Sequence, residues 1–195
     1  MSDAIIAGID EAGRGCLAGP VVAAACIFDR KTCKNEELPR ITDSKKMSAE
    51  EREEAFAFLT QHCAYGVGRA DAETVDAIGI LGATEAAMHQ ALENLMQKVT
   101  PTYLLIDGRD HFWFDIPHSS IIHGDASEDA IAAASVLAKV TRDRLMVAYD
   151  REFPGFGFAE HKGYGTPFHF EILRRTGFCP LHRKTFLRTI HSVTS

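Results

Sequence analysis

Short apolar runs that end in acidic residues limit the possible folds of this chain more than any other feature. Continuous apolar runs of this length are typical of strands that are covered on both faces of a sheet. The three runs and their acids are Ala4–Ile9 with Asp10 and Glu11, Tyr103–Ile106 with Asp107, and Ile121-Ile122 with Asp125. If these strands pair, their carboxylates converge. A single Asp-Glu pair would favour a solvated surface turn, but the recurrence of acids after apolar runs reverses that interpretation.

Helical and further strand patterns lie between these runs, so that strands and helices alternate along the chain. We expect Asp125 to stand just before the N-terminus of the helix that Ser127 caps. Polar or aperiodic stretches at 29–46 and 153–165 predict loops. The other predicted elements are a strand at Val21–Phe28, a helix from Ser48 to His62 with Ala55, Phe58, Leu59 and His62 buried, a strand at Tyr65–Ala70, a brief helix after Asp71, a longer one with Leu81, Met88, Leu92, Leu95 and Val99 on one side, a helix from Ser127 to Glu152, and a last helix from Thr166 to Gly177.

Composition indicates one soluble domain spanning residues 1–195, which we expect to be a monomer. No apolar run reaches the roughly 18–20 residues that a membrane span needs. The N-terminus lacks the pattern of a secretory signal. Five cysteines without a CxxC pair favour neither a disulfide framework nor a cysteine zinc site. These features predict a reducing, cytoplasmic location without a membrane partner.

The charge is unevenly distributed. The net charge is −6, yet residues 161–195 carry six Lys or Arg and one Glu, which leaves −11 for the first 160 residues. A basic end can supply contacts to nucleic-acid phosphates in an acidic protein. A solvated basic tail is an equally good interpretation of charge alone.

The converging acids predict a divalent metal site. Four carboxylates at close range raise one another's pKa values, and cations remove that penalty. Two ions about 3.5–4 Å apart can together promote in-line attack on a phosphate. Oxygen ligands favour Mg²⁺ or Mn²⁺ over zinc. After the first acids, Gly13 and Gly15 let the backbone approach a ligand, and Arg14 offers a planar donor for phosphate.

The chain resembles bacterial ribonuclease HII over nearly its whole length, and the matching segments occur in the order found in that family. Several segments are too long to match by coincidence. They are Gly8-Ile9-Asp10-Glu11-Ala12-Gly13-Arg14-Gly15, Leu17-Ala18-Gly19-Pro20-Val21-Val22-Ala23-Ala24, Asp43-Ser44-Lys45-Lys46, Leu105-Ile106-Asp107-Gly108, Gly124-Asp125, Ile131-Ala132-Ala133-Ala134-Ser135, Ala138-Lys139-Val140-Thr141-Arg142-Asp143, His161-Lys162-Gly163-Tyr164-Gly165-Thr166 and His182-Arg183.

The resemblance implies an α/β, ribonuclease H-like fold with a central mixed β-sheet flanked by helices and a helical C-terminal region. It implies an endonuclease that hydrolyses the RNA strand of RNA–DNA hybrids and nicks duplex DNA 5′ to a single embedded ribonucleotide. The products carry 3′-hydroxyl and 5′-phosphate ends, and the cofactor is Mn²⁺ or Mg²⁺. The implied catalytic and metal-binding residues are Asp10, Glu11, Asp107 and Asp125.

The resemblance also implies how substrate is recognised. Gly13, Arg14 and Gly15 would hold the ribonucleotide around its 2′-hydroxyl, the group that separates RNA from DNA. Tyr164 would stack on the sugar of the next deoxynucleotide, although a loop aromatic alone is more often packed on a core. Ser44 and Lys45 would contact backbone phosphates.

Other polar residues have less definite roles. Ser135 and Asp143 could orient the acids. Lys139, Arg142, Lys162 and Arg183 could add charge along a duplex or be ordinary helix-surface ions. Two positions depart from the family pattern: Gly79 replaces a frequent asparagine, and His123 a frequent lysine.

Two rival interpretations remain. Ribonuclease HIII, a relative that handles a lone ribonucleotide poorly, carries an extra N-terminal domain, whereas here the first strand begins almost at Met1. A hybrid-binding module without catalysis would be marked by a missing acid, and all four are present.

Overall fold

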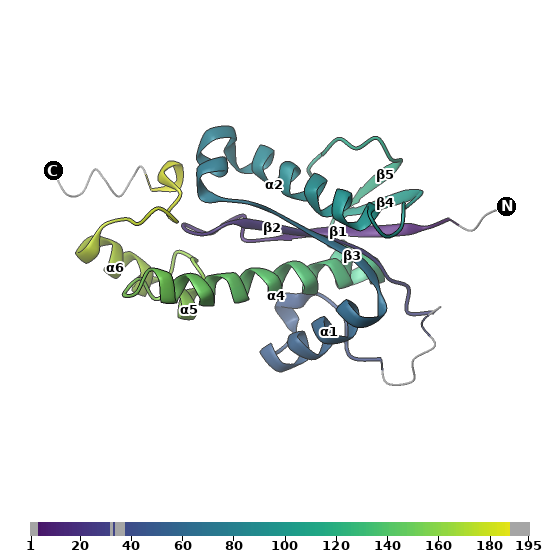
Figure 1. Cartoon of the computed structure of the whole chain (residues 1–195), viewed down its shortest axis with the longest axis horizontal. Helices are drawn as coiled ribbons and strands as arrows, with labels where there is room; N and C mark the ends of the chain where they lie inside the picture. Colours follow the sequence, from purple (N-terminus) through teal and green to yellow (C-terminus); the bar gives the residue numbers. More distant parts are fainter. Residues whose placement is uncertain (1–3, 32, 34–37, 188–195) are drawn as a thin grey trace.

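A five-stranded mixed sheet forms the centre of the molecule (Figure 1). The computed structural model describes residues 4–31, 33 and 38–187. The strand order is β3-β2-β1-β4-β5; β1 pairs antiparallel with β2 and parallel with β4. The strands are β1 (Ile6–Ala12), β2 (Val21–Ile27), β3 (Ala64–Ala70), β4 (Tyr103–Asp107) and β5 (His118–Ile121).

Helices cover both faces of the sheet. The long helix α2 lies on one face, and α1 and α4 lie on the other (Figure 1). Among the described residues, no helix has the length and apolar character needed to cross a membrane. The helices are α1 (Ala49–His62), α2 (Ala72–Met96), α3 (Gly124–Ser127), α4 (Asp129–Glu152), α5 (Phe158–His161) and α6 (Pro167–Thr176), with the short 3₁₀ helices η1 (Ser44–Lys46) and η2 (Lys184–Phe186).

Glycines let the helices approach the sheet closely. A Cβ at Gly8 of β1 would lie 2.1 Å from the backbone of Ala130 in α4. Cβ atoms at Gly66 and Gly68 of β3 would each lie 2.1 Å from a carbonyl oxygen of α2. These two glycines lower the strand propensity of β3, but they are required by the packing of α2.

Several predicted elements are confirmed. Helix α1 begins with the complete capping box of Ser48 and Glu51. Strand β4 has the predicted bounds, and α6 begins at the Thr166 cap and ends at Gly177, whose φ is 75°. The predicted change from a brief to a longer helix corresponds to Gly79, where a φ of 76° and a ψ of 166° kink α2.

Other predictions were wrong at element ends. Strand β1 continues to Ala12, so the first two acids lie inside the strand, because pairing with β2 extends to Val22. Ser127 does not cap α4. It ends α3, and Glu128 occupies the cap position of α4 without a side-chain hydrogen bond.

The predicted loops contain short helices that lack a sequence period long enough to detect. Helix α5 lies in the stretch expected to be irregular, and η1 lies at the end of the loop 29–46. Two residues assigned to buried faces, His62 and Leu81, are exposed. Residues 32, 34–37 and 188–195, which belong to the predicted loop and the predicted basic end, lie outside the described residues.

Candidate active site

Parallel pairing of β1 with β4 brings the first acids together. Ile9 lies opposite Ile106 in the register, so the next residues, Asp10 and Asp107, are neighbours at the same end of the sheet. The chain then passes through β5 and enters α3, which carries Asp125. The predicted convergence of these three acids is confirmed by their positions.

The three acids form a compact, largely buried cluster. One carboxylate oxygen from each of Asp10, Asp107 and Asp125 lies within 4.8 Å of the others. Asp10 and Asp125 are each 5% exposed. Asp10 accepts a hydrogen bond from the backbone N–H of Glu11 at 2.7 Å and another from the hydroxyl of Ser135. These hydrogen bonds fix the orientation of the Asp10 carboxylate. Metal-binding carboxylates are commonly oriented by hydrogen bonds of this kind.

The cluster carries an unfavourable charge that the protein only partly compensates. Burial raises the pKa of Asp10 well above its usual range, and the charges of Glu11 and Asp107 raise it further. Burial and the charge of Asp107 likewise raise the pKa of Asp125. The ammonium group of Lys45 lies 3.8 Å from Asp125 and lowers that pKa in part. A bound cation would remove the remaining repulsion.

Glu11 lies beside the cluster and faces two ways. Its Oε1 accepts a hydrogen bond from Arg14 at 3.2 Å. Its Oε2 is buried and has no hydrogen-bond partner among the described residues. Burial raises the pKa of Glu11, while Arg14 opposes that shift. An orphaned carboxylate oxygen next to three clustered carboxylates fits a divalent cation with oxygen ligands.

The Gly13-Arg14-Gly15 turn follows β1 directly. Gly13 has a φ of 94°, and a Cβ there would lie 2.0 Å from the Nε of Arg142, so only glycine fits. The guanidinium of Arg14 binds Asp110 at 2.8 Å as well as Glu11. Arg14 is thus held by two acids. Asp110 was not identified from the sequence, because an acid in an irregular loop has no distinguishing pattern.

Two arginines predicted to lie along the duplex or on a helix surface have a different role. Arg142 and Arg183 are fully buried. Arg142 donates to the carbonyl oxygens of residues 18, 20 and 162, and Arg183 donates to those of residues 14 and 19. Both interpretations were wrong for this pair. Their guanidinium groups organise the loop between β1 and β2 because backbone carbonyls there have no strand partner.

The Asp43-Ser44-Lys45 segment borders the acids. The Ser44 hydroxyl is buried and bonded to that of Ser135 at 2.7 Å, so it is engaged inside the protein. Only Lys45 presents its side chain, which is 78% exposed. Asp43 lies against Asp125 and raises its pKa, although sequence reasoning assigned Asp43 no role. Its place in the Asp43-Ser44-Lys45-Lys46 segment was the available signal.

Tyr164 stands on a tight turn near the glycine turn. The residue is 41% exposed, and its hydroxyl is hydrogen-bonded to the thiol of Cys16. The ammonium group of Lys139 lies 5.6 Å from the ring centroid and is bonded to Asp143 at 2.8 Å. The structure therefore places the Tyr164 hydroxyl next to Cys16, directly after the Gly13-Arg14-Gly15 turn.

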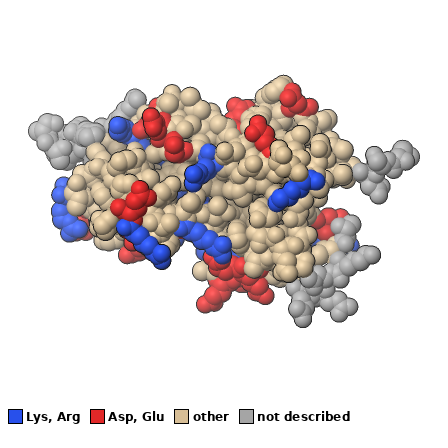
Figure 2. All heavy atoms as spheres, in the orientation of Figure 1, with Lys and Arg blue, Asp and Glu red and all other residues tan. Residues whose placement is uncertain are grey.

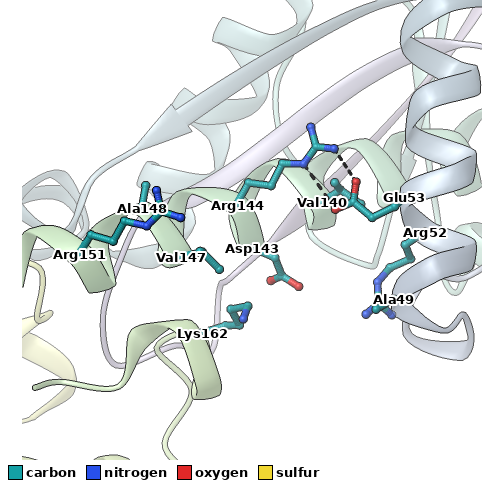
Figure 3. A pocket seen from close by; sticks show the side chains of 10 residues that line it. All are labelled: Ala49, Arg52, Glu53, Val140, Asp143, Arg144, Val147, Ala148, Arg151 and Lys162. Atoms are coloured by element: carbon teal, nitrogen blue, oxygen red, sulfur yellow. Dashed lines mark hydrogen bonds and ion pairs between the residues drawn. The ribbon is translucent and has the colours of Figure 1, made fainter. Parts of the chain in front are cut away.

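A pocket of about 380 Å³ lies between α1 and α4, and Asp143 is part of its lining (Figure 3). Arg144 pairs with Glu53 across it, as Figure 3 shows. Arg52 donates to the backbone carbonyl of Ser44, which connects the pocket to the Lys45 segment. On the surface, Lys and Arg side chains lie over α4 and α5, next to a group of acidic side chains on α1 (Figure 2). The pocket lining includes Arg52, Arg144, Arg151 and Lys162.

Comparison with known proteins agrees with this geometry. The family profile described as Ribonuclease HII matches residues 7–191. The ribonuclease HII of Geobacter metallireducens is 52% identical over 182 residues, covering 93% of this chain and 83% of that protein. That of Clostridioides difficile is 46% identical over 186 residues, covering 95% of this chain and 71% of that protein.

The fold is also that of a solved relative. The crystal structure of ribonuclease H2 from Pyrococcus horikoshii OT3 aligns with a TM-score of 0.78 at 26% sequence identity, covering 96% of this chain and 97% of that one. The α/β ribonuclease H-like architecture is thereby confirmed. The acid cluster, the long profile match and the shared fold together place this chain in the ribonuclease HII family.

Proposed function

We propose that the protein is an endonuclease that hydrolyses the RNA strand of RNA–DNA hybrids and nicks duplex DNA 5′ to a single embedded ribonucleotide. The observation that carries this proposal is the convergence of Asp10, Asp107 and Asp125, with Glu11 beside them, in a chain of the ribonuclease HII family. The products would carry 3′-hydroxyl and 5′-phosphate ends.

The cofactor in this proposal is Mn²⁺ or Mg²⁺, held by the four acids. When bound, the metal would supply the positive charge that promotes in-line attack on the phosphate. The protein's own residues set up the site beforehand. Ser135 orients the Asp10 carboxylate, and Lys45 offers a cation beside Asp125. The buried Oε2 of Glu11, which has no hydrogen-bond partner among the described residues, would be available to hold the metal.

Substrate choice would depend on the two turns near the acids. The backbone amide of Gly15 can approach a 2′-hydroxyl, since nothing lies within 4 Å of a Cβ built there, and Gly13, packed against Arg142, would shape the turn that holds the ribonucleotide. Arg14 can exchange one of its acid partners for a phosphate. The exposed face of Tyr164 would test the next sugar, and Lys45 would contact backbone phosphate. Ser44 would act through Ser135.

We further propose that residues 1–195 act as one monomeric domain in the cytoplasm. Support comes from the five-stranded sheet against which α1, α2 and α4 pack, and from the five cysteines, which are all free thiols.

Nick mapping tests the proposal. A DNA duplex with one ribonucleotide is incubated with the protein and Mg²⁺ or Mn²⁺, and the cut is mapped at nucleotide resolution. We expect one nick 5′ to the ribonucleotide and none with chelator or with an all-DNA duplex. An uncut substrate, or cutting in chelator, would refute the proposal.

A further inference from the structure

Three buried histidines lie next to Tyr164, and the proposed chemistry uses none of them. His161, His169 and His182 are 6%, 0% and 2% exposed. The rings of His161 and His169 stack with centroids 3.9 Å apart. The Nε2 atoms of His169 and His182 are 3.1 Å apart, which places one shared proton between them.

The partners of these rings fix the direction of each hydrogen bond. The carbonyl oxygen of Tyr164 can only accept, so Nδ1 of His169, 2.9 Å away, must donate. In a neutral ring its Nε2 then accepts from Nε2–H of His182. The Nδ1 of His182 is left to accept from the backbone N–H of Cys179 at 3.0 Å. One continuous chain of donors thus runs from Cys179 through both histidines to Tyr164.

The opposite arrangement leaves a conflict. His182 Nδ1 also lies 3.2 Å from the carbonyl oxygen of Cys179 and could donate to it. His169 would then have to donate from Nε2, and its bare Nδ1 would face the Tyr164 carbonyl. A doubly protonated His169 would avoid this conflict, but burial lowers its pKa to about 4. The first arrangement therefore satisfies every group with neutral rings.

The series of hydrogen bonds from Cys179 to Tyr164 ends at a strained turn. Lys162 and Gly163, immediately before Tyr164, have φ values of 51° and 82°. The carbonyl of His161 accepts from the N–H of Tyr164 at 2.9 Å, and its Nδ1 accepts from the N–H of Gly163 at 3.0 Å. The N–H of Tyr164 is thus held by the His161 backbone, and its C=O accepts from Nδ1 of His169 and from the N–H of Thr166 at 2.8 Å. These bonds fix the backbone that carries the exposed ring.

We propose that His169 is a positioning residue for Tyr164, and that the hydrogen-bond chain through His182 sets the ring where it discriminates a ribonucleotide–deoxyribonucleotide junction. This inference rests on the proposed function, because it presupposes that Tyr164 reads the sugar after the ribonucleotide. The exposed ring supplies the contact, and the buried histidine determines its orientation.

The test separates positioning from general stability with two substitutions at one site. His169→Leu keeps apolar volume but removes the donor, whereas His169→Asn keeps an amide donor at the Nδ1 position. We measure kcat/KM on a duplex with one ribonucleotide and on a uniform RNA–DNA hybrid. One lost hydrogen bond predicts about a tenfold fall in the junction-to-hybrid ratio for the leucine variant. The asparagine variant should restore most of that ratio.

A double-mutant cycle with Tyr164→Ala separates the role of His169 from the proposed role of Tyr164. If His169 acts through Tyr164, the double variant has the same junction-to-hybrid ratio as Tyr164→Ala alone. A further fall in the double variant would overturn the inference. An unchanged ratio in Tyr164→Ala itself would instead refute the role of the tyrosine in the proposed function.

Ring ¹⁵N spectra of the unmodified protein give a test that needs no variant to fold. We expect His169 as the Nδ1–H tautomer and His182 as the Nε2–H tautomer at neutral pH. The reverse pair of tautomers would overturn the inference, as would equal losses on both substrates in the leucine variant.

Discussion

Asp10 illustrates how a carboxylate that we propose as a metal ligand can be costly for folding. Its burial and its acidic neighbours raise its pKa, so the ionised form destabilises the metal-free protein at neutral pH. We predict that Asp10→Asn reduces cleavage by more than about 100-fold and raises the melting temperature of the metal-free protein. Duplex binding should remain, because the basic side chains are unchanged.

Calorimetry with and without Mn²⁺ checks the stability part of this prediction. Metal bound at 100 times its Kd stabilises a protein by about 2.7 kcal/mol, so the unmodified protein should melt at a higher temperature when Mn²⁺ is added. Asp10→Asn should lose most of that response. Asp115→Asn, at an exposed acid outside the cluster, is the matched control and should behave like the unmodified protein. Loss of duplex binding together with cleavage would show that Asp10 is structural.

The contact between β1 and α4 depends on the missing side chain of Gly8. A Cβ there would overlap the backbone of Ala130, which cannot move like a side-chain end. We predict that Gly8→Ala lowers the free energy of unfolding by about 1–3 kcal/mol or more. Gly82→Ala, in the straight part of α2 with only Ile78 at 3.4 Å, should instead raise it by about 0.5–1 kcal/mol. Urea unfolding measures both, and equal effects would contradict the packing argument.

Elements could be predicted where local chemistry determines them. The capping box of α1, the apolar run of β4 and the Thr166 cap of α6 are local signals, and the structure confirms them. The extension of β1 through Asp10 depends on pairing with β2, a contact that hydrophobic period alone does not reveal. The same limit applies to α5, whose four residues are too few to show a period.

The residues of the site also differ in whether local sequence signals could predict their roles. Convergence of Asp10 and Asp107 follows from the parallel pairing of the two apolar runs that precede them, and it could be inferred from the sequence. The bonds of Arg142 and Arg183 to loop carbonyls could not, because an arginine in a helix or loop reads as a surface cation until its burial is known. Asp110 was missed for the same reason: its role exists only through Arg14.

The hydrogen-bonded pair of His169, in α6, and His182 predicts a specific dependence of stability on pH. Burial lowers the pKa values of His169 and His182 to about 4, whereas the unfolded value is near 6.5. Between these values the unfolded chain binds more protons, so stability is full above pH 6.5, falls as the pH is lowered, and levels off below about 4. The raised pKa values of Asp10 and Asp125 act in the opposite direction.

Comparison with His169→Asn isolates the histidine contribution, because both proteins share the acids. Urea midpoints between pH 7 and 4.5 should decline less steeply in the variant. Parallel declines in the two proteins would contradict the assigned role of His169 in this pH range.

Taken as a whole, the molecule has a net charge of −6, and three of the arginines near the site are engaged inside the protein or in an ion pair. Arg142 and Arg183 serve internal carbonyls, and Arg144 is paired with Glu53. Arg151 lines the pocket between α1 and α4 without a hydrogen bond or ion pair to any described residue (Figure 3). Asp143 joins this pocket to the Lys139 and Tyr164 side of the site. We infer that Arg151 is placed to contact a phosphate of the bound duplex.

This placement predicts the salt dependence of duplex binding. Losing one phosphate contact reduces the slope of log K against log salt concentration by about one. Arg151→Ala should show that reduction, and Arg69→Ala, at an exposed position of the edge strand β3, should leave the slope unchanged. Both are measured in the Asp10→Asn background, so that binding is recorded without cleavage. If Arg151→Ala weakened binding equally at all salt concentrations, the lost contact would not be ionic, and the duplex would have to be placed away from this pocket.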